Sequence, residues 1–115
     1  MNYVRLFTGE DGLSHFEDVD VKLSGGGTSE LSDAMAVTNL VFRRNRPDYD
    51  LDWHPAPRRQ FVVNLTGEVE IEASGGETRR FGPGSVMLAE DTTGKGHKSR
   101  AVGNAERLSL FVYLP

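Results

Sequence analysis

The chain has 115 residues, a formal net charge of −4, a pI near 5.3 and no cysteine. This length suits one domain with one core. The absence of cysteine excludes disulfides, thiolate nucleophiles and cysteine-ligated zinc. The acidic balance argues against a nucleic-acid partner, and no apolar stretch approaches the roughly 20 residues that cross a bilayer. Because the N-terminal residues lack the apolar segment of a signal peptide, a soluble cytoplasmic protein is expected.

Short apolar runs, rich in β-branched and aromatic residues and separated by glycine-bearing turns, predict an all-β chain. So many short strands favour a sandwich or closed barrel, because both architectures hide sheet edges. A glycine-rich loop is expected over 24–29. Strands are predicted over residues 3–7, 16–23, 34–44, 59–65, 69–73, 78–81, 85–88 and 108–114.

One of these runs alternates strictly between apolar and acidic residues, from Glu68 to Glu72. Side chains along a strand point to opposite faces in turn. Val69 and Ile71 are therefore predicted to face the core, while the three glutamates face solvent.

Two glycine-framed stretches carry two of the three histidines. The first, residues 53–67, reads W-H-P-A-P-R-R-Q-F-V-V-N-L-T-G. It resembles the first motif of the cupin superfamily, in which His-x-His is followed by Glu and, after six residues, by Gly. His54 corresponds to the first His, Ala56 to the second, Gln60 to the Glu and Gly67 to the closing Gly.

The second stretch resembles the second cupin motif. Gly84 opens it and His97 corresponds to its histidine, after a turn about two residues longer than usual, whereas Ala101 stands where the motif has Asn. The resemblance covers about residues 40–114. It implies a double-stranded β-helix, or jelly-roll barrel, and an uncharacterised group of small single-domain cupins carrying similar motifs. Members of this superfamily have many different activities, so the resemblance is specific for fold rather than function.

By this resemblance, His54, Gln60 and His97 would hold a divalent metal such as zinc, nickel, iron or manganese. Two imidazoles and an amide oxygen make a neutral donor set, which is weaker than one that includes a carboxylate. Glu72, Glu90 and Asp91 are the candidates for the carboxylate ligand that this donor set lacks. In the alternative interpretation, the histidines line a polar cavity without metal. No dinucleotide fingerprint is present, so no organic cofactor is predicted.

The same region supplies further candidates for contacting a substrate. Arg58 offers a guanidinium group for an anion, and Lys95 lies in a glycine-flanked loop before His97. Trp53 precedes the first motif histidine and would cover a pocket or pack in the core. Glu72, Glu90 and Asp91 are also candidate substrate-binding residues.

These features predict a single domain, 1–115, that binds a small polar or anionic metabolite inside a barrel. One hypothesis is a metal-dependent enzyme of the isomerase, lyase or dioxygenase type; the alternative is a metal-free binding or sensing protein. Residues 1–33 precede the motif-bearing barrel and are expected to pack on it or on a dimer partner. A homodimer is expected, because an open sheet edge tends to pair with another chain.

Overall fold

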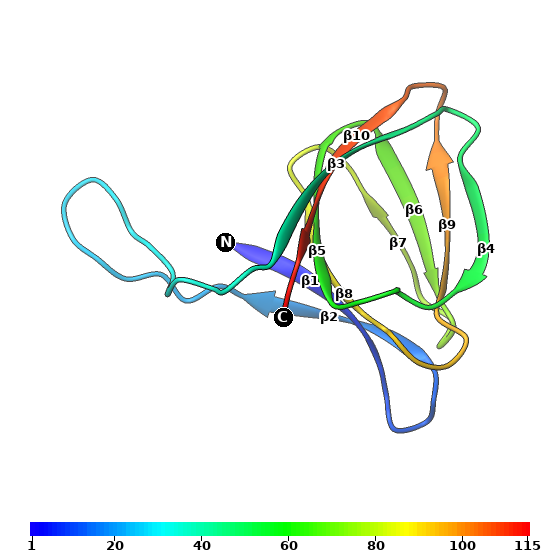
Figure 1. Cartoon of the computed structure of the whole chain (residues 1–115), viewed down its shortest axis with the longest axis horizontal. Helices are drawn as coiled ribbons and strands as arrows, with labels where there is room; N and C mark the ends of the chain where they lie inside the picture. Colours follow the sequence, from blue (N-terminus) through cyan, green and yellow to red (C-terminus); the bar gives the residue numbers. More distant parts are fainter.

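The computed structural model describes residues 1–115 and contains ten β-strands and no helix (Figure 1). No segment is therefore a helix long and apolar enough to cross a membrane. The all-β prediction is confirmed. The strands are β1 (Asn2–Thr8), β2 (Ser14–Asp20), β3 (Asn39–Asn45), β4 (Asp50–His54), β5 (Gln60–Thr66), β6 (Glu68–Ala73), β7 (Thr78–Phe81), β8 (Val86–Glu90), β9 (His97–Val102) and β10 (Arg107–Tyr113).

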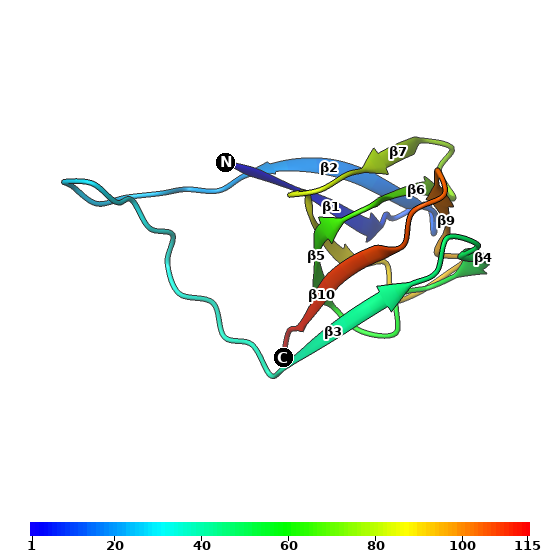
Figure 2. The ribbon, with the colours of Figure 1, turned by 90° about the horizontal axis from the view of Figure 1, so that it is seen from above.

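The strands form two sheets that face each other across a common interior (Figures 1 and 2). One sheet has six strands in the order β2-β1-β8-β5-β10-β3, and the other has four in the order β4-β9-β6-β7. All pairs are antiparallel except β1 with β8. Each sheet has two free edges, so neither sheet closes into a barrel by itself. The closed barrel that the sequence also allowed is therefore not formed by either sheet alone.

The interior between the sheets is built from the alternating faces of their strands. Along β6, Val69 is 2% and Ile71 is 4% exposed, as the alternation predicts. On the opposite face of β6, Glu70 pairs with Arg80 and Arg100 of the neighbouring strands. From the six-stranded sheet, Leu6, Met87 and Ala89 join the same core.

Two strands, β4 and β9, were not predicted, because polar residues interrupt any apolar alternation in them. In β9, the buried positions are His97 and Ser99, so no apolar alternation marks the strand. In β4, the sequence D-L-D-W-H is mostly polar and pairs with β9 through an irregular register. Periodicity cannot reveal a strand whose buried face lines a polar cavity.

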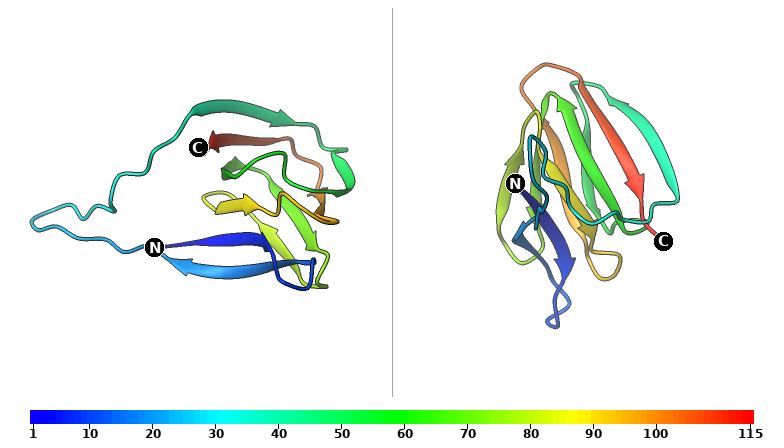
Figure 3. Two further views of the ribbon diagram at one scale, coloured as in Figure 1. Left: turned by 60° about the horizontal axis from the view of Figure 1, so that its bottom comes forward. Right: turned by 90° about the vertical axis from the view of Figure 1, so that its left-hand side faces the viewer.

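The N-terminal hairpin packs on its own chain. β1 and β2 pair with each other, and β1 pairs with β8, so this hairpin extends the six-stranded sheet. The prediction of a strand over 34–44 is correct only from Asn39 onward. Residues between β2 and β3 instead extend away from the two sheets (Figures 1 and 3).

Glu90, at the end of β8, joins three segments of the six-stranded sheet. It accepts a hydrogen bond from Arg5 Nε on β1 and another, at 2.9 Å, from Arg59 Nε before β5. Burial alone would raise the pKa of Glu90, but the hydrogen bonds and charges of both arginines outweigh it and lower the pKa below the ordinary 4.5. The ionised form therefore stabilises the folded state.

We expect Glu90→Gln to lower the free energy of unfolding by about 1–2 kcal/mol at pH 7, because charge-assisted hydrogen bonds are lost. The pKa of Glu90 is lower in the folded than in the unfolded chain, so its stabilisation is complete above the unfolded value and disappears as pH falls through the folded one. Urea titrations at pH 7 and pH 3 measure both effects. Glu68→Gln, which removes a 3.8 Å surface pair, should change stability by less than about 0.5 kcal/mol. Equal losses in the two variants would contradict the assignment.

Candidate ligand-binding cavity

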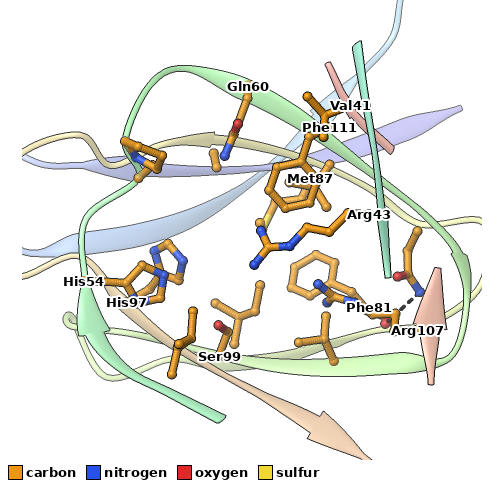
Figure 4. Close-up of a pocket in the computed structure, with 18 of the residues that line it drawn as sticks. Val41, Arg43, His54, Gln60, Phe81, Met87, His97, Ser99, Arg107 and Phe111 are labelled. Carbon is orange, nitrogen blue, oxygen red and sulfur yellow. Dashed lines mark hydrogen bonds between the residues drawn. The ribbon is translucent and has the colours of Figure 1, made fainter. Parts of the chain in front are cut away.

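A cavity of about 310 Å³ lies between the two sheets and is lined by 22 residues (Figure 4). Twelve of these are hydrophobic, and none is an aspartate or a glutamate. Its size is near the lower end of the range of ligand pockets, about 300–1,000 Å³. The cavity therefore suits a small molecule with an apolar portion.

His54 and His97 lie together on one side of the cavity, with their ring centroids 4.5 Å apart (Figure 4). Each ring is held through Nδ1. His54 Nδ1 lies 2.7 Å from the backbone oxygen of Asp52, and His97 Nδ1 lies 2.6 Å from Oδ2 of the fully buried Asp91. A hydrogen bond at Nδ1 fixes the ring orientation and leaves Nε2 free for a ligand, a proton or a metal.

The backbone brings the two histidines together. His54 and His97 are register partners of β4 and β9, and Ala56 N donates a 3.0 Å hydrogen bond to the backbone oxygen of Asp91. Gly96 makes this approach possible, because its φ is 75° and a Cβ there would lie 2.0 Å from His54 O. The small residue at position 96 is thus a geometric requirement of the site.

Gln60 enters the cavity wall from β5 (Figure 4). It is 4% exposed, and its Oε1 has no hydrogen-bond partner within the protein. Asn64, two inward-facing positions further along β5, likewise leaves Oδ1 unpaired. Buried polar atoms without partners are costly, so both oxygens are available to a water, a ligand or an ion.

Of the three arginines that line the cavity, Arg58 is exposed, whereas Arg43 and Arg107 bring positive charge into the interior without a carboxylate beside them. Arg43 of β3 extends into the middle of the pocket, with its guanidinium carbon 4.7 Å from the Phe111 ring centre (Figure 4). Arg107 of β10 is 6% exposed and donates a 3.1 Å hydrogen bond to Asn45 Oδ1, while its Nε is unpaired. The cavity is therefore cationic and partly apolar.

The environment of Arg107 disfavours its charge. Burial is the main cause that lowers the pKa of Arg107 below its ordinary value; Tyr49 opposes this shift, and the neighbouring Arg43 lowers the pKa further. Arginine nevertheless remains protonated at neutral pH. An anion entering the cavity would compensate this buried charge, so the electrostatic free energy favours anionic ligands.

The candidates predicted from sequence divide into two groups. His54, Gln60, His97 and Arg58 line the cavity, and Asp91 reaches it through its hydrogen bond to His97. The remaining four lie elsewhere: Trp53 and Lys95 contact each other outside the lining, Glu72 borders a shallow polar depression, and Glu90 pairs with Arg5 and Arg59.

The carboxylate sought as an additional metal ligand is therefore not found at Glu72 or Glu90. Glu72 alternates with inward-facing Ile71, so it points away from the interior. Glu90 is occupied by two arginines on the sheet. Asp91 is already hydrogen-bonded to His97 and acts on the cavity only through that ring.

Sequence reasoning missed Arg43, Arg107 and Tyr49 as cavity residues. Arg43 belongs to a basic run, R-R-N-R, and Arg107 comes directly before the strand predicted over 108–114, outside any motif. The one available signal was alternation, because Arg43 and Val41 share a strand face, as do Arg107, Ser109 and Phe111. A charged residue on the face of a strand that points into the core marks a candidate site.

No group of three or more histidine, aspartate or glutamate side chains is arranged to hold a metal ion. The histidine pair alone is compatible with one: two imidazoles that bind one ion side by side at about 2.0–2.1 Å have ring centres about 4.5–5 Å apart. The observed centroid distance is 4.5 Å, and the buried Gln60 Oε1 is an unpaired oxygen donor. The spacing of the two rings therefore suits two ligands of one divalent ion, whereas Gln60 lies apart from the pair on the cavity wall (Figure 4).

These features define a two-sheet, all-β protein with an internal cationic cavity. No family model matches the chain, and no curated protein matches it. Among solved structures, it is similar to protein NMB1881 from Neisseria meningitidis, with a TM-score of 0.53 and 12% identity. The match covers 76% of this chain and 90% of the other, and at this identity it supports similarity of fold alone.

We expect Gly96→Ala to destabilise the protein and displace the histidine pair, because the added Cβ would collide with the His54 carbonyl. Gly103→Ala is the matched control, since Gly103 has a φ of 79° and open space around its Cβ position. The left-handed conformation alone should cost about 1–2 kcal/mol in each variant. Gly96→Ala should lose at least about 2 kcal/mol more, measured by urea unfolding. Equal losses would show that the close approach is unimportant.

Proposed function

We propose that this protein binds a small organic anion, such as a carboxylate with an aromatic or aliphatic body, in the cavity between its sheets. The single observation that carries this proposal is the pair of guanidinium groups, Arg43 and Arg107, in a cavity without any carboxylate. Arginine binds carboxylates through paired, charge-assisted hydrogen bonds. Apolar walls formed by residues such as Phe81 and Phe111 would surround the body of the ligand.

The histidine pair would contact the other end of such a ligand. Arg43 stands between the histidines on one side of the pocket and Arg107 on the other (Figure 4). His97, oriented by the buried Asp91, has the geometry of a general acid or base whose Nε2 accepts or delivers a proton. This arrangement supports chemistry on a group next to the bound carboxylate, and it equally supports simple binding.

The finer fold assignment belongs to the same proposal. A jelly-roll cupin is supported by the two motifs, by the two facing sheets, and by the position of His54, Gln60 and His97 around one cavity. Ala56 and Ala101 depart from the motifs. A cytoplasmic location agrees with the absence of cysteine.

We expect benzoate and hexanoate to bind the protein and their neutral amides, benzamide and hexanamide, to bind at least tenfold more weakly. Arg107→Met should weaken carboxylate binding at least tenfold, because one or more charge-assisted hydrogen bonds of about 1.5–3 kcal/mol disappear. Chemical-shift titration at constant ionic strength measures both effects.

The stability of Arg107→Met separates a binding role from a structural one. Removing the buried charge relieves its desolvation, which offsets the loss of the hydrogen bond to Asn45 Oδ1, so the melting temperature should change little. Arg44→Met is the matched control, because Arg44 lies on the other face of β3 and is 70% exposed. A large fall in melting temperature, together with unchanged carboxylate affinity, would contradict the proposal.

The second candidate function is a metal-dependent enzyme of the isomerase, lyase or dioxygenase type. The observation that favours it is the pair of histidines whose Nδ1 atoms are both engaged, since metal-binding histidines usually have this arrangement. His54, His97 and Gln60 would hold the ion, and a substrate carboxylate could supply the missing negative charge. A divalent ion would polarise a bound carbonyl or lower the pKa of a bound water.

We expect zinc, nickel, manganese or iron(II) to bind the wild type with one-to-one stoichiometry and His54→Ala to abolish this binding. Gln60→Glu should tighten it about tenfold, because a carboxylate offsets the charge of the ion. Calorimetric titration measures both affinities. The absence of binding in wild type and Gln60→Glu, together with a lowered melting temperature for Gln60→Glu, would instead support a metal-free cavity, in which the buried carboxylate lacks a partner.

A further inference from the structure

The six-stranded sheet carries apolar side chains on its outer face as well as on its inner face. Register pairs Leu110 with Phe42 on β3 and with Val63 on β5, so these residues project from the same side. Met87 and Ala89 of β8 project inward and belong to the interior core. We call the opposite surface the outer apolar face; its main residues are Leu40, Phe42, Phe61, Val63, Leu110 and Val112.

This face is most open to solvent along β3, and its residues on β5 and β10 are half-buried. Phe42 is 78% exposed and Leu40 is 55% exposed, and both lie on β3, a free edge of the sheet. A contiguous apolar surface of this kind is uncommon on a monomeric protein and typically marks an interface. A seven-residue unpaired edge strand is a second feature that proteins usually cover.

A segment that we call the arm, residues 24–37, extends beside this face. It connects β2 to β3, the two edge strands of the six-stranded sheet. All of its residues are exposed, including the apolar Leu31, Met35 and Val37, and its backbone hydrogen bonds are limited to one Ser24–Leu31 bridge. Figures 1 and 2 show the arm standing out on the side away from the four-stranded sheet.

We propose that two copies of this chain pack their outer apolar faces together about a twofold axis, with the arm of each copy lying against the other. A twofold contact places the same patch on both sides, so an apolar face that meets its own copy is self-complementary. The arm of each copy stands out on the side where the partner's sheets would then lie.

The areas explain why both the face and the arm are needed. With strands about 4.8 Å apart and about 3.3 Å per residue, the faces of β3, β10, β5 and β8 cover about 400 Å² in plan. A stable interface buries about 800 Å² per partner. The face alone falls short of that area, and the exposed arm of 14 residues supplies the additional surface.

The interface is tested by sedimentation equilibrium on the full chain from about 0.1 to 50 μM. The wild type is expected to be a dimer with a Kd below about 1 μM, typical of an interface of this size. Phe42→Asp should raise this Kd at least 100-fold, because it places a charge within the apolar contact. Phe42 is largely exposed in the single chain, so the variant keeps its fold, which circular dichroism checks.

Leu13→Asp is the matched control. Leu13 is also an exposed apolar residue, at 39%, but it lies in the turn between β1 and β2, away from the outer apolar face. The dimer dissociation constant of Leu13→Asp should remain within about twofold of the wild-type value. A monomeric wild type at 50 μM, a larger or open-ended assembly, or an unchanged Kd for Phe42→Asp would each overturn the proposal.

The position of the arm is tested with a spin label, since the chain has no cysteine of its own. Met35→Cys carrying a nitroxide label is mixed with unlabelled, nitrogen-15 wild type, and amide signals are compared with those of a diamagnetic control. Contact with the partner should broaden amides of the wild-type copy around the outer apolar face. Dimers without such intermolecular broadening would overturn the assignment of the arm.

Discussion

Apolar side chains have to be removed from water on both faces of the six-stranded sheet, and this constraint accounts for most of the molecule. The inner face meets the four-stranded sheet and encloses the core and the cavity. The outer face has no covering element in its own chain, and the arm extends beside it (Figure 2). A two-sheet chain with a double-sided apolar sheet therefore requires a third layer, which a second copy supplies in our proposal.

The cavity reflects an electrostatic compromise within this packing. Arg107 is buried among apolar and polar groups without an anion, and its lowered pKa records the unfavourable desolvation. Proteins usually retain such a charge only where a partner compensates it. The proposed organic anion would provide that partner. The buried charge of Arg107, which lowers the stability of the empty protein, would then also provide affinity and selectivity for anionic ligands.

The histidine pair depends on backbone geometry as much as on side-chain chemistry. Gly96 permits the close approach of two chain segments, and Asp91 fixes the ring of His97. Both residues lie in the segment between β8 and β9. This short connection therefore contains the carboxylate that orients His97 and the glycine that allows the backbone of His54 to come close. A change in that connection would alter both together.

The sequence by itself determined the all-β class, the alternation of β6 and the placement of His54, Gln60 and His97 on one cavity, because these depend on local patterns and motif spacing. Only the tertiary structure decided that Arg43 and Arg107 share the cavity. They meet because β3 pairs with β10 in a register that sets Arg43 opposite Ser109, beside Arg107. Pairing between strands so distant along the chain is set by the packing of whole sheets, and no local pattern records it.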